Sequence, residues 1–252
     1  MIDTDRSGHL SPAPNRWLPY IDDSDLEAVV SSVLAADNKG SDYVPDPFSA
    51  VFDATIQGIS LDLWLEQESR RKAQKTLQNK IGYFHQRVLG RAYGCEDLGV
   101  GHGIDFRCKE KRIVAEIKNK YNTTKGSDRA KIYDILDDAL SNGVHAGYTG
   151  YYVEVVPSVP GGYNKPFAPP DSINHSKKTA SKNIRMIDGR SFYALVTGID
   201  DALDQLYSVL PGVLEKLGLS NQTHTDTALY EKMYRDAYGV SVDGEARRLW
   251  EI

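Results

Sequence analysis

The chain has 252 residues, of which 40% are hydrophobic and 26% charged, the composition of an ordinary globular protein that can bury a substantial core. The formal net charge of −5 argues against a strongly basic nucleic-acid-binding protein, although a basic cleft can lie on an acidic body. No uncharged run is long and apolar enough for a membrane span, and the N-terminus lacks the features of a signal peptide. The two cysteines, Cys95 and Cys108, lack metal-ligand spacing, so we expect a protein of the reducing cytoplasm.

The sequence pattern of the first 95 residues predicts mainly helices. Residues 1–16 hold several Gly, Pro and Ser residues and little periodicity, and we interpret them as a loose arm. A helix begins after the N-cap residue Asp22, and a second one covers Phe48 to Ile56 and ends at Gly58. The longest helical pattern runs from Leu61 to about Ala92. Its second half carries one apolar stripe, formed by Leu77, Ile81, Phe84, Val88 and Leu89.

The second half of the chain predicts both strands and helices. Its elements are a hairpin over residues 103–120, a helix over Asp128–Leu140, strands over Ala146–Val156 and Ser191–Thr197, and helices from Asp200 or Asp201 to Leu217 and from Thr225 to Ala237. Between the two single strands, residues 157–190 form a long polar segment without strong periodicity. Such a segment predicts a loop that is either functional or disordered.

This order of elements predicts an α/β fold with a mixed central sheet, whose first strands are antiparallel and whose later strands are joined by a helical crossover. We expect one domain over residues 1–252, because no linker separates the N-terminal helices from the sheet. Within it we distinguish a helical part at 17–95, an α/β core at 96–218 and a C-terminal helix at 219–252.

The stretch from Gly103 to Lys120 is the most informative part of the sequence. Its alternation has a period of two, so it predicts two strands whose side chains point to opposite faces. With the turn centred on residues 110–111, Asp105 lies directly across from Glu116, and Lys118 follows on the same face. The opposite parity is apolar and consists of Ile104, Phe106, Cys108, Ile113, Ala115 and Ile117.

Two facing carboxylates require an explanation, because like charges placed opposite each other in a sheet are destabilising. A divalent cation, which prefers hard oxygen ligands, would offset the repulsion between Asp105 and Glu116. The alternative is a solvated hairpin whose carboxylates face each other by chance. A plain structural α/β protein of that kind leaves this charge pattern unexplained.

A known signature is present in the same stretch. Gly103-Ile-Asp105, ten intervening residues and Glu116-Ile-Lys118 resemble the signature of the PD-(D/E)xK nuclease superfamily, with an isoleucine in place of the proline. Upstream, Ile81-Gly-Tyr-Phe-His-Gln86 resembles the helix that precedes this signature. The run from Asp46-Pro-Phe through Gln78-Asn-Lys-Ile-Gly to Glu116-Ile-Lys-Asn-Lys-Tyr-Asn-Thr resembles Type II restriction endonucleases that cut GGNCC-like sites. The resemblance covers roughly residues 45–150.

The resemblance implies a role for each residue of the signature. Asp105 and Glu116 would bind Mg²⁺ together with the backbone carbonyl of Ile117. Lys118 would orient or help deprotonate the attacking water and stabilise charge on the phosphoryl oxygens, and a nearby dication would lower its pKa. Gln86 would approach the same water as a catalytic residue, or would instead have a packing role. For the neighbouring His85 we favour a place in the core.

Two segments are candidates for contact with double-stranded DNA, since Arg, Lys, Asn and Gln side chains bind phosphates and base edges. The first follows the signature and contributes Lys120, Asn122 and Lys125. The second lies in the basic region 161–190, which holds six Lys or Arg residues and two acidic ones. Its candidates are Asn174, His175, Lys177, Lys178, Lys182, Asn183 and Arg185. A solvated surface position is the alternative for each of these residues.

On this resemblance we expect a Mg²⁺-dependent Type II restriction endonuclease that cuts double-stranded DNA at a specific sequence and leaves 5′-phosphates. A palindromic site would imply a homodimer whose two-fold axis matches that of the DNA. A DNA methyltransferase is implied as a genetic partner, not as a bound one. The alternatives are a nuclease of the same fold used in repair or by mobile elements, and a DNA-binding module without catalysis.

Overall fold

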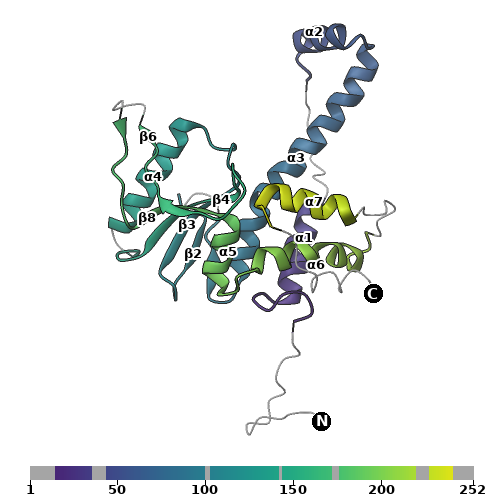
Figure 1. Ribbon diagram of the computed structural model, residues 1–252. Helices are drawn as coiled ribbons and strands as arrows, with labels where there is room; N and C mark the ends of the chain where they lie inside the picture. Colours follow the sequence, from purple (N-terminus) through teal and green to yellow (C-terminus); the bar gives the residue numbers. More distant parts are fainter. Residues whose placement is uncertain are drawn as a thin grey trace, which may run out of the picture.

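The computed structural model describes residues 15–35, 44–99, 103–141, 144–171, 176–219 and 227–240. Figure 1 shows a central sheet with helices packed on it. The helices are α1 (Asp23–Leu34), α2 (Pro47–Gln57), α3 (Leu61–Arg91), α4 (Gly126–Ser141), α5 (Gly189–Thr197), α6 (Ala202–Lys216) and α7 (Thr227–Tyr238). The strands are β1 (Cys95–Asp97), β2 (Phe106–Cys108), β3 (Ile113–Lys120), β4 (Thr149–Val156), β5 (Asn164–Pro166), β6 (Pro170–Asp171), β7 (Ser176–Lys177) and β8 (Ile184–Asp188). Within the described ranges, no helix has the length and apolar character that a membrane crossing requires.

Six strands form one mixed sheet in the order β1-β2-β3-β4-β8-β5. β2 pairs antiparallel with β1 on one side and with β3 on the other. β4 runs parallel to β3 and is connected to it through α4, which is the helical crossover that the sequence predicts. β8 is parallel to β4, and β5 pairs antiparallel with β8 at the edge. The α/β fold with a mixed sheet is therefore confirmed.

Apolar side chains cover both faces of the sheet. On one face, residues of α1, α5, α6 and the last turns of α3 pack against the strands, and Phe106 and Phe192 are fully buried there. On the other face, Val114 and Tyr152 pack against Leu136 of α4. A sheet that is buried on both faces is typical of α/β proteins with parallel strands. The strand β3 is therefore held from both sides.

The three N-terminal helices form where the sequence predicts them. Asp46 caps α2 by accepting a hydrogen bond from the backbone N–H of Phe48 (3.0 Å), and Pro47 occupies the first turn, where a missing N–H costs little. Gly58 ends α2 in the left-handed conformation. The apolar stripe predicted on α3 is buried only toward its C-terminal end, because Leu77 is 44% exposed.

The prediction that the segment after β4 is a loop throughout is wrong. Residues 157–190 contain four short strands, β5 to β8, and β8 lies in the central sheet beside β4. Ile184 and Ile187 of β8 are buried on opposite faces of the sheet. Strands of two to five residues carry too little periodicity to be recognised in a sequence. The same reason explains why the three-residue strand β1 was not predicted.

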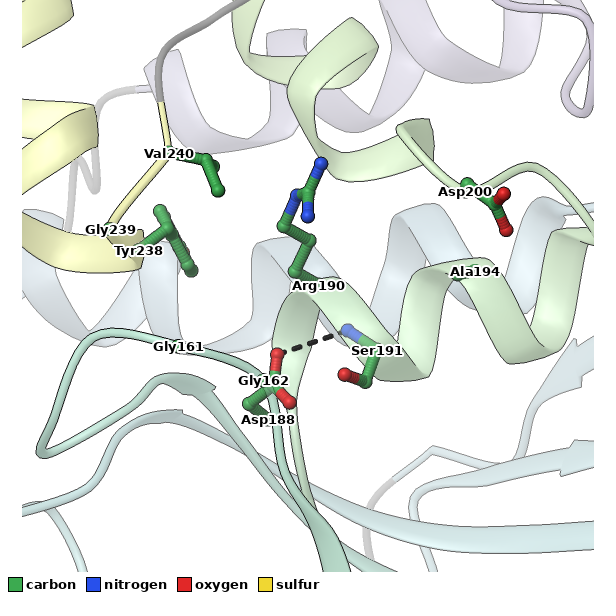
Figure 2. Close-up of a pocket in the computed structure, with 10 residues that line it drawn as sticks. All are labelled: Gly161, Gly162, Asp188, Arg190, Ser191, Ala194, Asp200, Tyr238, Gly239 and Val240. Atoms are coloured by element: carbon green, nitrogen blue, oxygen red, sulfur yellow. Dashed lines mark hydrogen bonds between the residues drawn. The ribbon is translucent and has the colours of Figure 1, made fainter.

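The prediction of a strand over Ser191–Thr197 is also wrong, because this segment forms most of α5. Its aromatic and β-branched residues favour a strand locally. However, Asp188 caps a helix at this point, since its Oδ1 accepts a hydrogen bond from the N–H of Ser191 (3.0 Å; Figure 2). Phe192, Tyr193 and Val196 then fall on one helical face and are buried. Burial of that face outweighs the local strand propensity.

Gly189, the first residue of α5, lies against the backbone of β4. A Cβ atom at this position would lie 2.5 Å from the carbonyl oxygen of Val155 and 2.6 Å from its Cα. Backbone atoms cannot yield as the end of a flexible side chain can. The close crossing of α5 over β4 therefore requires glycine at this residue.

We predict that Gly189→Ala destabilises the protein by about 1–3 kcal/mol, the usual cost of overpacking. Urea unfolding curves measure the change as a shift in the midpoint. Gly126→Ala is the matched control, because Gly126 begins α4 and a Cβ there meets nothing within 4 Å. Equal midpoints for the two variants would contradict the close packing of α5 on β4.

Candidate active site

β2 and β3 form a hairpin in the register that the sequence predicts. Phe106 pairs with Ala115, which centres the turn on residues 110–111 and places Asp105 across from Glu116. Asp105 lies just before β2, and its backbone N–H donates a hydrogen bond to the carbonyl of Ala115 (3.0 Å). This bond goes to the residue that pairs with Phe106, so Asp105 is held against β3 although the regular pairing begins only at Phe106.

The predicted alternation fails at one residue of this hairpin. Ile104 packs with Val114 on the α4 side of the sheet, not with Phe106 on the opposite side. The regular strand begins only at Phe106, and Gly103 has a φ of +71°. This turn of the backbone redirects Ile104, so the period of two does not extend to it.

The structure brings Asp105, Glu116 and Lys118 together. The Nζ of Lys118 lies 2.5 Å from Oε1 of Glu116 and 4.0 Å from Oδ2 of Asp105. Oδ2 of Asp105 also accepts a hydrogen bond from the backbone N–H of Ile117 (3.0 Å). The side chains of Asp105, Glu116 and Lys118 are 20%, 14% and 30% exposed, so the cluster is shielded but still reachable from solvent.

Burial and mutual repulsion shift the pKa values of the two carboxyl groups. Burial, together with the negative charge of Asp105, raises the pKa of Glu116 to about 7, although Lys118 acts in the opposite direction. Burial also raises the pKa of Asp105, against the effects of the Ile117 N–H and of Lys118. Burial alone would lower the pKa of Lys118, but Glu116 and Asp105 outweigh it and raise that pKa. Keeping both carboxylates ionised therefore costs free energy.

The donor set at this point fits a hard divalent cation. Two carboxylates converge on one spot, and a bound cation would relieve the repulsion between them. In a strand, the N–H and C=O of one residue point to the same side. The carbonyl of Ile117 therefore faces the side on which its N–H meets Asp105. Within the described parts of the chain, no group of three or more His, Cys, Asp or Glu side chains is placed to hold a metal ion, so the third protein ligand would be this carbonyl.

Gln86 reaches the cluster from α3. Its side chain is buried, and its Nε2 donates to Oδ1 of Asp97 (2.8 Å) and, at 3.4 Å, to the backbone carbonyl of Asp105. This amide group links α3, the end of β1 and the start of β2. No sequence signal points to Asp97, since no motif surrounds it and β1 itself carries no clear pattern.

An open cleft of about 1160 Å³ surrounds the cluster. Its walls come from the middle of α3, from β3 and from the loop after β3. The residues from α3 include Gln78, Asn79 and Gly82, which belong to the run that resembles restriction endonucleases. Their position in the cleft was not foreseen from the sequence, which assigned them no role.

The first group of candidate DNA-contacting residues lies at or near this cleft. Lys120 and Asn122 line it, and Asn119, of the opposite parity on β3, lines it as well. Lys125 is exposed immediately before α4. Cations placed along an open cleft beside a carboxylate cluster suit a phosphate backbone.

The second group is divided between paired and exposed side chains. Lys178 lies within 2.7 Å of Asp134 on α4 and 3.1 Å of Asp171 on β6, and these ion pairs hold the β6–β7 ribbon against α4. Arg185 on β8 donates to the side-chain and backbone oxygens of Asn164 on β5. Lys177, Lys182 and Asn183 are exposed. Asn174 and His175 lie outside the described residues.

Glu154 and Arg129 form a buried ion pair next to Lys118, to which no sequence signal points. Glu154 on β4 lies opposite Lys118 in the β3–β4 pairing and is 1% exposed. Its two carboxylate oxygens accept hydrogen bonds from Nη2 of Arg129 and from the hydroxyl of Tyr163, both at 2.7 Å. This network ties the first turns of α4 to the sheet directly beside the cluster.

His85 and a second cavity do not belong to this site. His85 is largely buried beside Phe84 and Tyr193, and a ring nitrogen lies 2.9 Å from the hydroxyl of Tyr193. The second cavity, of about 320 Å³, lies between the start of α5 and the end of α7 (Figure 2). The guanidinium of Arg190 in its wall is paired with Asp204 at 2.8 Å.

Known proteins are similar to this chain over most of its length. The family model described as Eco47II restriction endonuclease matches residues 18–218. The Type II restriction enzyme Eco47II of Escherichia coli is 39% identical over 238 residues, which are 88% of this chain and 99% of that enzyme. The Type II restriction enzyme Sau96I of Staphylococcus aureus is 26% identical over 213 residues, which are 80% of this chain and 81% of that enzyme. The matched range includes the sheet and every residue that lines the cleft.

The buried histidine predicts a dependence of stability on pH. Burial lowers the pKa of His85 from 6.5 to about 4 in the folded protein. The unfolded chain therefore binds more protons between these values, so the stability contributed by neutral His85 is present above pH 6.5 and is lost as the pH falls toward 4. We expect a loss of at most about 3 kcal/mol from this group.

Chemical unfolding of the wild type and of His85→Gln across this pH range measures the effect. The glutamine side chain stays neutral and can still bond the hydroxyl of Tyr193, so the variant should show a shallower fall in stability. Carboxylate titrations affect both proteins equally and cancel in the comparison. Parallel curves for the two proteins would exclude a buried neutral His85.

Proposed function

Since this chain belongs to the Eco47II restriction endonuclease family and is a Type II restriction endonuclease, we propose that Asp105, Glu116 and Lys118 are the residues with which it hydrolyses DNA. The observation that carries this proposal is the placement of the Lys118 ammonium 2.5 Å from Glu116 and 4.0 Å from Asp105. These groups lie in a cleft that is open along one side of the sheet. A site-specific deoxyribonuclease needs such a reachable, charged centre.

Mg²⁺ is the proposed cofactor, and Asp105, Glu116 and the carbonyl of Ile117 are its proposed ligands. When bound, the ion would neutralise charge on the phosphate and lower the pKa of water at the site. The raised pKa values of both carboxyl groups support this assignment, because they show the cost of placing two negative charges together. The same cost is removed when a cation lies between the two groups.

Lys118 is proposed to position the attacking water and to stabilise negative charge on the phosphoryl oxygens. Its ammonium group is held by Glu116, and 30% of the side chain remains exposed to the cleft. Gln86 is proposed to position the catalytic residues, since its amide group donates hydrogen bonds to Asp97 and to the backbone carbonyl of Asp105. It fixes the start of β2 relative to α3 and so fixes the distance between the two carboxylates.

The DNA substrate is proposed to lie along the cleft, with its phosphates near Lys120, Asn122 and Lys125. Asn174, His175, Lys177, Lys178, Lys182 and Arg185 remain the proposed contacts of the region around β6, β7 and β8. A GGNCC-like recognition sequence is supported by the motif resemblance alone. We also propose a homodimer, because two active sites related by a two-fold axis match the symmetry of a palindromic site.

Lys118→Ala should abolish cleavage of plasmid DNA in the presence of Mg²⁺ while leaving DNA binding largely intact. The reason is that Lys118 acts on the reacting phosphate and water, whereas affinity comes mostly from contacts to the phosphate backbone. Cleavage is measured by gel electrophoresis, and binding by fluorescence anisotropy with Ca²⁺ in place of Mg²⁺. We expect a loss in cleavage rate of at least about 10²-fold, a size common for one acid–base or electrostatic group.

Lys109→Ala is the matched control for this experiment. Lys109 lies at the turn of the same hairpin, is 65% exposed and pairs with Glu96, away from the cluster. It should cut at the wild-type rate and give discrete fragments, whose ends identify the recognition sequence. Normal cleavage by Lys118→Ala would refute the proposed roles, and smeared products from the wild type would favour a nonspecific nuclease of the same fold.

Lys182→Ala should weaken DNA binding nearly equally for all sequences. It should also lower the salt dependence of the binding constant. Each phosphate contact that is lost reduces the slope of log K against log salt by about one. Titrations at several salt concentrations measure this slope. The control is Lys232→Ala, since Lys232 on α7 is 65% exposed and pairs with Asp236. An unchanged slope for Lys182→Ala would leave this lysine as a plain surface residue.

A further inference from the structure

The helix α2 exposes an apolar stripe. Phe48, Phe52 and Ile56 follow one another at a spacing of four residues and are 75%, 68% and 83% exposed. Val51, three residues after Phe48, is 55% exposed. Residues at this spacing lie on one face of a helix, so the four side chains form a continuous outward stripe.

The opposite face of α2 is apolar as well. Ala50 and Ala54 are buried there against Trp64 of α3. The indole N–H of Trp64 donates to Oδ2 of Asp53 (2.8 Å), which fixes α2 against α3. A helix that is apolar on both faces is usually buried on both. Only one of these faces is covered by the described parts of the chain.

The exposed stripe is too large for an ordinary monomer surface. Two phenylalanines at 75% and 68% exposure contribute on the order of 200–350 Å², given 150–250 Å² for each buried aromatic side chain. Val51 and Ile56 enlarge this area, and Leu61 and Leu65 at the start of α3 are 51% and 46% exposed. Soluble monomers rarely expose apolar patches of more than a few hundred Å². The tip formed by α2 and the start of α3, residues 47–65, therefore has the character of an interface.

The chemistry of this tip does not suit DNA. Its exposed stripe carries no Lys or Arg, whereas contacts to a phosphate backbone require cations. Further along α3 the charges are ordered by sign. Asp62 and Glu66 come first, and Arg70, Arg71, Lys72 and Lys75 follow, whereas Glu68 is buried and pairs with Arg71.

This order of charges is complementary to a second copy of itself. In a two-fold interface, a residue i of one copy contacts j of the other while j contacts i. Two α3 helices that cross antiparallel would place the acidic start of each beside the basic middle of the other. Glu66 and Arg70 are 57% and 79% exposed even though they pair within one helix, so both remain available to a neighbouring chain.

The position of the tip fits the same partner. Figure 1 shows α2 and the first half of α3 extending away from the sheet. The middle of α3 lines the cleft with Gln78 and Asn79, and its last turns enter the core. The tip thus lies on a helical extension of the cleft wall and away from the sheet.

We propose that the tip, residues 47–65, is the surface through which two copies of this chain associate, with the stripe of Phe48, Val51, Phe52 and Ile56 at its centre. This inference rests on the proposed function in one respect, namely that two copies act on one DNA duplex. It assigns the association to the α2–α3 tip and not to the edges of the sheet.

Sedimentation of the full chain without DNA or Mg²⁺ tests the proposal and does not depend on catalysis. The wild type should dimerise as its concentration is raised. Phe48→Asp/Phe52→Asp should raise the dimer dissociation constant by at least about 30-fold, the factor that corresponds to one interface hot spot. Phe52→Ala, which only shortens an exposed side chain, should shift the constant in the same direction by less.

Val144→Asp is the matched control, because Val144 is 79% exposed and lies in the loop before β4. It should dimerise as the wild type does. Circular dichroism confirms that the variants remain folded. A dimer that survives the double Asp substitution would overturn the proposal, as would equal losses in the variant and the control. A wild type that stays monomeric at all concentrations would also overturn it and would leave the stripe to a different protein.

Loss of this association and loss of catalysis can be told apart. Lys118→Ala should dimerise normally, since it lies in the cleft and not on the tip. The Phe48→Asp/Phe52→Asp variant should retain the catalytic cluster but produce nicked plasmid in place of double-strand breaks at low protein concentration. Double-strand breaks at the wild-type rate from a monomeric variant would contradict the need for two copies.

Discussion

The repulsion between two carboxylates on one hairpin is the constraint on which the proposed active site depends. Asp105 and Glu116 face each other because the register of β2 and β3 leaves them no other position. Lys118 and the backbone N–H of Ile117 compensate the repulsion in part. The pKa of Glu116 nevertheless remains raised, which shows that the compensation is incomplete. Such a site needs a rigid frame, because a flexible hairpin would let the charges separate.

The frame is supplied by burial of the sheet on both faces. α4 covers one side of β3, and α5, α6 and the end of α3 cover the other. Two polar networks at the site add to this frame. Gln86 connects α3 to Asp97 and Asp105, and Glu154 connects α4 to the sheet through Arg129. The Gln86 amide and the Glu154 carboxylate each make two hydrogen bonds, and such bonds favour precise placement of charges in a partly buried site.

The helix α3 connects the proposed catalytic cleft with the proposed dimer interface. The last turns of α3 lie in the core, its middle lines the cleft and its start carries the apolar tip. A continuous helix transmits position over this length without a hinge. The net charge of −5 is compatible with DNA cleavage on this arrangement, because the cations proposed to contact DNA lie beside the cleft and in the β6–β8 region, whatever the sign of the total.

The sequence by itself determined the local structure and the chemistry of the hairpin. The helix starts at Asp22 and Asp46, the period of two in residues 103–120 and the opposition of Asp105 and Glu116 all follow from short-range rules. The tertiary structure alone decided the rest. Ser191–Thr197 is a helix because its apolar face is buried under the sheet. β8 is a strand because it pairs with the edge of β4. The contact of Gln86 with Asp97 and the exposure of the α2 stripe likewise depend on which distant residues meet, and no local pattern encodes that.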